Sequence, residues 1–211
     1  MNVKIRLENE KDYRAVEELT REAFWNVHVP GCCEHYLIHT LRRSPDFIPE
    51  LDFFAVSGGK IVGHIAYCRG QILDAAGERH PIIGFGPISV LPELQRQGIG
   101  SALINHSPEE AKKKGYKAVL IYGDPRYYNR FGFHFAEKYD IKTSFGKYAV
   151  ALLALELKPG ILSGISGSFV ESPAYDVDQQ ASEEFDKNFP PKEKCHTPTQ
   201  DEFKVMVSLM Y

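Results

Sequence analysis

Residues 82–103 read IIGFGPISVLPELQRQGIGSAL, and this stretch decides the fold. The apolar run up to Val90 predicts a buried strand, and the residues after the glycines begin a helix that runs towards Gly115. Gly98 and Gly100 stand at the junction, where the first N–H groups of a helix lack partners and carry partial positive charge. Because glycines leave these N–H groups uncovered, the junction predicts an anion site, and a pyrophosphate suits it.

Three polar residues precede the glycines. Gln95, Arg96 and Gln97 can add amide and guanidinium donors around an anion. No Lys-Ser/Thr pair follows, so this is not a phosphate loop of the GxxxxGK[ST] kind, and the spacing of a G-x-G-x-x-G dinucleotide fingerprint is absent. Taken alone, the short pattern also fits a purely structural turn between a strand and a helix.

The order of the other predicted elements indicates one mixed sheet with helices on both faces. Pro108 is expected to kink the long helix or to restart it with Ser107 as a new cap. Strands are predicted at about 3–7, 81–90, 117–123 and 148–157, and two more within 52–70 on either side of a Gly58-Gly59 turn. Helices are predicted after Asn9, at 33–43, from the glycine loop to Gly115, and within 124–132.

The composition excludes several classes of protein. The chain has 211 residues, a net charge of −3 and no Lys/Arg-rich run, so no nucleic-acid partner is expected. No stretch approaches the roughly 18 uninterrupted apolar residues of a membrane span, and the first residues lack the apolar core of a signal peptide. The four cysteines are too scattered for a disulfide framework, so we expect a cytoplasmic protein with reduced thiols.

The character of the chain changes after Pro159-Gly160. Residues 171–211 hold nine acidic and four basic residues, so this segment alone carries −5. It also contains phenylalanines and ends in VMVSLMY, which argues against a free tail. We therefore expect residues 158–211 to form an extension that packs on the core or on a partner, and it could join the interface of a homodimer.

Two stretches in sequence order point to a family. GFGPISVLPELQRQGIGSALI (84–104), followed by GYKAVLIYGDPRYYNRFGF (115–133), resembles the GNAT superfamily of N-acetyltransferases, and specifically its YhbS-like bacterial branch. The resemblance covers about residues 1–157. It implies an α/β (α+β) fold with a mixed, largely antiparallel sheet and helices on both faces, and it makes residues 1–157 an acetyl-CoA-binding domain.

The resemblance also implies where acetyl-CoA binds. The pyrophosphate would lie on the loop from Gln95 to Ser101, and the fourth strand would bulge and splay from the fifth so that pantetheine pairs with its free edge. A backbone N–H there would stabilise the oxyanion that forms on attack. Without the loop that follows, FGPISV reads as an ordinary edge strand. The expected binding residues are Ile88, Ser89, Val90, Gln95, Arg96, Gln97, Gly98, Ile99, Gly100 and Ser101.

The catalytic acid is implied by the same family pattern. Tyr128 in YYNRFGF matches the family tyrosine whose phenol donates a proton to the departing thiolate, and Tyr127 is the second choice. As a lone tyrosine, Tyr128 also reads as a core aromatic. Glu22, Glu93 and His64 are candidate general bases by neighbourhood only, and none is chosen.

One cluster has the composition of a metal site. Cys32, Cys33, His35 and His39 lie close in sequence, and the two histidines share a helix face. No second pair of ligands with matching spacing exists, so we expect no metal. The segment FWNVHVPGCC (24–33) lies where this family commonly builds its acceptor pocket, so these residues would line that pocket or pack in the core.

These observations lead to two functions of different class. The leading hypothesis is an N-acetyltransferase that moves an acetyl or short acyl group from acetyl-CoA to a primary amine by direct attack. The alternative is a non-catalytic acyl-CoA-binding sensor or partner module. A nucleotide-binding regulator is a third hypothesis, and the sequence does not identify the amine.

Overall fold

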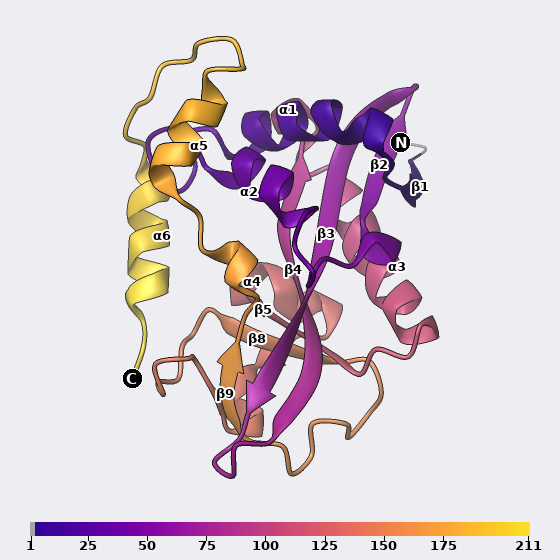
Figure 1. The fold of residues 1–211 in the computed structure, drawn as a ribbon, viewed down its shortest axis with the longest axis vertical. Coiled ribbons are helices and arrows are strands. Elements are labelled where there is room, and N and C mark those ends of the chain that lie inside the picture. Colours follow the sequence, from indigo (N-terminus) through magenta and orange to yellow (C-terminus); the bar gives the residue numbers. More distant parts are fainter. Residues whose placement is uncertain (1–2) are drawn as a thin grey trace.

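The computed structural model describes residues 3–211, in which nine strands form one sheet with helices on both faces (Figure 1). The main path of the sheet runs β1-β2-β3-β4-β5-β8-β6, and β9 pairs with both β3 and β7. The strands are β1 Lys4–Leu7, β2 Phe53–Ser57, β3 Lys60–Leu73, β4 Arg79–Val90, β5 Ala118–Tyr122, β6 His134–Phe135, β7 Ile141–Lys142, β8 Leu152–Glu156 and β9 Gly167–Val170. The helices are α1 Tyr13–Phe24, α2 Glu34–Leu41, α3 Ile99–Lys113, α4 Pro125–Tyr128, α5 Gln179–Asp186 and α6 Pro198–Ser208.

Most strand pairs are antiparallel, and two pairs in the described part of the chain, β4 with β5 and β7 with β9, are parallel. This sheet confirms the predicted mixed, largely antiparallel α/β architecture. Alternation along β3 explains the two helical layers. Ile65 and Tyr67 face the cluster that contains α3, whereas Ala66 and Cys68 face the cluster that contains α1 and α2.

Local signals define several elements as predicted. Asn9 caps the entry to α1 with a capping box, because its side chain accepts from the Lys11 N–H while Asp12 reaches back to the Asn9 N–H. Gly58 and Gly59 have φ of +57° and +80°, which is the backbone that a two-residue hairpin turn between β2 and β3 requires.

Two details of the prediction are wrong. The long helix does not restart at Pro108, because α3 runs through it and the Ser107 hydroxyl donates to the Leu103 carbonyl at 2.8 Å instead of capping a new helix. The late strand is shorter than residues 148–157. The N–H groups of Tyr148 and Val150 pair with the carbonyls of Tyr211 and Leu209 at the end of the chain, so β8 begins only at Leu152.

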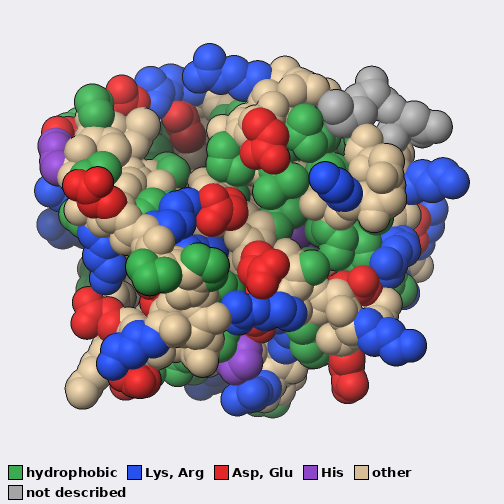
Figure 2. Space-filling view, turned by 90° about the horizontal axis from the view of Figure 1, so that it is seen from above, with side chains coloured by type: hydrophobic (Ala, Val, Ile, Leu, Met, Phe, Trp, Pro, Cys, Tyr) green, Lys and Arg blue, Asp and Glu red, His purple; other side chains and the backbone are tan. Residues whose placement is uncertain are grey.

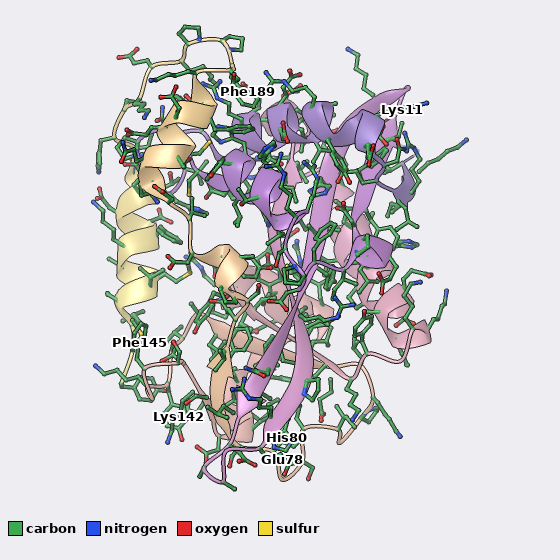
Figure 3. All side chains as sticks on the ribbon, in the orientation of Figure 1. Lys11, Glu78, His80, Lys142, Phe145 and Phe189 are labelled. Atoms are coloured by element: carbon green, nitrogen blue, oxygen red, sulfur yellow. The ribbon has the colours of Figure 1, made fainter. Side chains whose placement is uncertain are left out.

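The extension after residue 157 wraps around one side of the sheet (Figure 1). Strand β9 adds to the lower half of β3, and α5 packs beside α2. Phe189 is buried next to α1 (Figure 3), where the Arg14 guanidinium covers its ring at 3.7 Å. The division of the chain at residue 157 stays a prediction, as does a homodimer.

A buried polar network lies between β1, β2, β3 and α2. The Arg42 guanidinium donates two hydrogen bonds of 2.7 and 3.0 Å to the Glu8 carboxyl group and one of 3.2 Å to Glu17. His64 Nε2 lies 2.7 Å from Asp52 Oδ1, and the side chains of Glu8 and His64 are fully enclosed. Burial and the Asp52 carboxyl beside it raise the pKa of Glu8 to about 8.

The surface agrees with the mixed composition. On the face seen in Figure 2, acidic and basic side chains are interspersed, without a continuous patch of one sign. Among residues 3–211, no helix is both long enough and apolar enough to cross a bilayer.

Candidate active site

The strands β4 and β5 diverge beside a bulge in β4. They pair at Ile83 and Val119, before the bulge begins. Opposite the single residue Ala66 of β3, β4 places both Gly86 and Pro87, so one extra residue is accommodated there. The bulge shifts the alternation of β4, and Ile88 and Val90 then point into a cavity on the α3 side of the sheet.

That cavity, which we call the loop cavity, has a volume of about 610 Å³ and ends at the N-terminus of α3. Gly98 caps this helix with a φ of +89°, a conformation that strains every residue with a side chain. No side chain caps the helix, so its first N–H groups stay available to a ligand. A Cβ on Gly98 would meet nothing within 4 Å, whereas one on Gly100 would lie 2.8 Å from the Tyr127 hydroxyl.

Most of the predicted binding residues come together in the loop cavity, and two do not. Ser89 is buried beneath α1, where its hydroxyl donates to Thr20 Oγ1 at 3.1 Å. The Gln97 amide donates to the Glu93 carbonyl, on the outside of the turn. The predicted residues that line the cavity are Ile88, Val90, Gln95, Arg96, Gly98, Ile99, Gly100 and Ser101.

Two further residues line the loop cavity: Tyr127, which was named only as the second choice for the acid, and Arg130, which was not predicted. Arg130 stacks on the ring of Tyr127, with 4.3 Å between the guanidinium carbon and the ring centroid. Neither Arg130 nor Arg96 has a carboxylate within 4.0 Å among residues 3–211, so both cations are free for an anionic ligand. The sequence YYNR contains a signal for this pair, because Tyr127 and Arg130 are three residues apart and residues with that spacing share one face of a helix.

Tyr128 is more deeply buried than Tyr127 and, unlike Tyr127, does not line the loop cavity. Its ring packs against Phe85 and Phe133, and the absence of a side chain on Gly123 makes room for it. Burial raises the pKa of Tyr128 well above its usual value, so the phenol is protonated at neutral pH. Its hydroxyl makes no hydrogen bond within the described chain.

None of the candidate bases lines the loop cavity. Glu22 pairs with Lys192 at 2.7 Å on the surface, and Glu93 is exposed in the turn before the loop. His64 belongs to the buried network, where desolvation lowers its pKa to about 4. A histidine that is neutral and sealed from solvent cannot exchange protons with a substrate.

The cysteine and histidine cluster is used for packing. His39 Nδ1 lies 2.8 Å from Glu17, and His35 Nδ1 lies 3.4 Å from Cys32 Sγ. The extension also covers the segment 24–33, since the Trp25 indole donates to the Glu193 carbonyl at 2.8 Å. The extension therefore takes up part of the surface where the sequence predicted an acceptor pocket.

Comparisons with known proteins agree with this geometry. The profile of the acetyltransferase (GNAT) domain matches residues 49–135. An N-acetyltransferase named YhbS from Escherichia coli K12 is 28% identical over 164 residues, which cover 77% of this chain and 92% of that protein. A second E. coli N-acetyltransferase, YjhQ, is 33% identical over 98 residues, or 46% of this chain and 53% of that protein.

Solved structures extend the agreement to the fold. The crystal structure of E. coli YhbS in complex with CoA has a TM-score of 0.74 and 24% identity, covering 84% of this chain and 93% of that one. A GNAT acetyltransferase from Brucella melitensis in complex with acetyl-CoA has a TM-score of 0.66 and 26% identity, covering 83% and 99%. Together with the bulged β4 and the glycine loop, these matches make the chain similar to N-acetyltransferases of the GNAT superfamily, YhbS among them.

Proposed function

We propose that the chain transfers an acetyl or short acyl group from acetyl-CoA to a primary amine by direct attack. The observation that carries this proposal is the loop cavity, which joins an uncapped helix N-terminus to the free edge of a bulged strand. The first feature suits a pyrophosphate, and the second suits an extended amide chain such as pantetheine. The complexes of the two similar proteins with CoA and acetyl-CoA support the same ligand.

In this proposal the pyrophosphate binds at the loop around Gly98 and Gly100. The free guanidinium groups of Arg96 and Arg130 add positive charge at the mouth of the cavity. The pantetheine then follows β4 past Val90 and Ile88 towards the bulge. There the thioester carbonyl accepts a hydrogen bond from a backbone N–H of β4, which stabilises negative charge as it develops on the oxygen.

The transfer has to account for the three N–H protons of the substrate ammonium group. The amine nitrogen forms a bond to the thioester carbon, the C–S bond breaks, and the Tyr128 phenol gives its proton to the leaving sulfur. Of the three N–H protons of the ammonium substrate, one stays on the amide, one replaces the proton that Tyr128 gave, and one leaves to solvent. The buried, protonated state of Tyr128 suits this role.

The state of Cys68 supports direct attack of the amine on the thioester, without an acyl-enzyme intermediate. Cys68 lies on β3 on the opposite side of the sheet from the loop cavity, and its side chain is almost completely buried. Burial raises the pKa of the Cys68 thiol to about 12, so it is not a thiolate at neutral pH. We expect no acetylated protein by intact mass spectrometry after incubation with acetyl-CoA alone.

The experiment that tests the proposal combines binding and turnover. Calorimetry should show acetyl-CoA binding, and thiol release should require an added amine from a panel of small amines, aminoglycosides and lysine peptides. Gly98→Asp should abolish binding, because a carboxylate then stands where the pyrophosphate would lie. Binding without amine-dependent release would instead indicate an acyl-CoA sensor, and competition by ATP as strong as by CoA would indicate a nucleotide-binding regulator.

A further inference from the structure

A second cavity lies at the same strand divergence, on the opposite side of the sheet from the loop cavity. Leu120 of β5 packs with Phe169 of the extension on that side, whereas its neighbours Val119 and Ile121 pack with α3. We call this the far-side cavity. It is lined by Cys68, Arg69, Gly70, Gly84, Phe85, Leu120, Ile121, Phe169, Glu171, Ser172 and Tyr175.

The far-side cavity is small, with a volume of about 10 Å³. That is room for one group of the size of a water molecule. Gly84 lets β4 and β5 lie close together at one wall of this space, because a Cβ there would come within 2.8 Å of the Leu120 carbonyl oxygen. The Tyr175 hydroxyl donates to the Gly86 carbonyl at 3.3 Å, which fixes the cavity wall directly at the β4 bulge.

Glu171 is the acidic side chain of the far-side cavity. It comes immediately after β9, whose pairing with β3 carries it to this position. It has no hydrogen bond and no ion-pair partner among residues 3–211, although Arg69 lines the same cavity. The side chain remains open to solvent, yet the surrounding protein raises the pKa of the Glu171 carboxyl to about 7 by desolvation.

We propose that Glu171 is the general base of the transfer reaction and that the far-side cavity admits the nitrogen of a primary amine. This inference rests on the proposed function. The thioester would reach the bulge from the loop cavity, and the amine would reach it from the other side through the gap between β4 and β5.

The surroundings of Glu171 suit a cationic amine. Tyr122 and Phe169 lie side by side, with ring centroids 5.8 Å apart, next to the carboxylate. Aromatic faces and an unpaired carboxylate together attract an ammonium group. The small volume has room for an ammonium nitrogen alone, which favours a primary amine over a secondary or branched one.

The proton balance follows from this placement. The Glu171 carboxylate takes one proton from the bound ammonium, which frees the nitrogen lone pair to form the bond to the thioester carbon. Glu171 then releases this proton to the solvent to which it is open. The other proton that the nitrogen loses compensates the one that Tyr128 donates to sulfur.

The test compares Glu171→Gln with Glu183→Gln, a matched change in the same extension whose nearest cation, Lys194, is 3.6 Å away. With the most active amine of the panel at saturation, wild-type kcat should rise with pH and level off above about 7. Glu171→Gln should lower kcat by at least about 100-fold and remove this rise. The Kd of acetyl-CoA and the thermal unfolding midpoint should not change, and Glu183→Gln should behave as wild type.

Wild-type kcat and an unchanged pH profile in Glu171→Gln would overturn the inference. A raised KM for the amine with kcat and its pH dependence retained would also overturn the role as base. If the wild type releases no thiol with any amine, the proposed function fails and the inference falls with it, whereas thiol release that Glu171→Gln leaves unchanged overturns the inference alone. In an active wild type, a carboxyl titration followed by NMR and assigned with Glu171→Gln supports the inference near pH 7 and contradicts it near 4.5.

Discussion

Glu8 and Glu171 are both carboxyl groups whose pKa is raised by desolvation, but their surroundings differ. Glu8 is enclosed, held by Arg42 and adjacent to Asp52, so its proton is shared inside a closed network. Glu171 has no partner among residues 3–211 and remains open to solvent at the divergence of β4 and β5. A base must exchange its proton with substrate and solvent, and only the second arrangement permits this.

This difference shows that a shifted pKa indicates a functional group only where substrate and solvent can also reach that group. Buried ion-pair networks also shift pKa values, and they do so while contributing to structure. The same distinction separates His64 from a catalytic histidine, since its pKa is lowered to about 4 in a sealed site. The predictions below test whether the network and the far-side cavity are as different as their geometry indicates.

The largest effect is expected from removing the cation of the network. Arg42→Met leaves Glu8 buried without its donor and removes one of the two partners of Glu17, which should lower the free energy of unfolding by about 3–5 kcal/mol. Urea denaturation measures this loss. Arg43→Met is the control, because Arg43 is exposed and has no carboxylate within 4.0 Å in the described chain. Equal stability of the two variants would show that the network contributes little.

The next effect concerns catalysis alone. Tyr128→Phe should lower kcat by about 100-fold, because the thiolate then leaves without a proton, while the Kd of acetyl-CoA stays within about twofold. Tyr127→Phe decides between the two tyrosines, since Tyr127 lines the loop cavity and faces Gly100. Tyr139→Phe, outside both cavities, is the control. Unchanged kcat in Tyr128→Phe would remove Tyr128 from the mechanism.

A smaller effect should appear in the pH dependence of stability. The folded-state pKa of Glu8, about 8, lies above its ordinary value of 4.5, so its contribution is fully present below pH 4.5 and is lost as pH rises through 8. Relative to Glu8→Gln, which cannot ionise, the wild type should become less stable as the pH rises across this window. Unfolding free energies of both proteins at several pH values measure the loss. A constant difference would mean that Arg42 keeps Glu8 ionised throughout.

The sequence predicted the features that depend on neighbouring residues. The cap at Asn9, the Gly58-Gly59 turn and the glycine loop before α3 follow from local chemistry and are present. The restart at Pro108 is absent because Tyr67, which is 40 residues away, lies 2.8 Å from the Ser107 hydroxyl and helps to bury it inside the helix packing. Propensity alone does not include such tertiary contacts.

The far-side cavity could not be found in the same way. Glu171 lies in an acidic extension outside the stretches that resemble the family, and it reaches the strand divergence only because β9 pairs with Gln71–Leu73. Neither Cys68 nor Tyr175 has a sequence signal that links it to Glu171. The cavity is made by four segments that lie apart in the sequence, so only the folded chain brings its residues together.

The smallest effect is expected at a carboxylate that belongs to neither group. Glu22 is exposed and pairs with Lys192 of the extension at 2.7 Å. Exposed ion pairs contribute little, because water screens them and two long side chains must be ordered. Glu22→Gln should therefore change the free energy of unfolding by less than about 0.5 kcal/mol and leave kcat and its pH profile as in the wild type. A loss of the pH-dependent rise in this variant would move the base from the far-side cavity to the end of α1, and the contrast between paired and unpaired carboxylates would no longer identify the catalytic group.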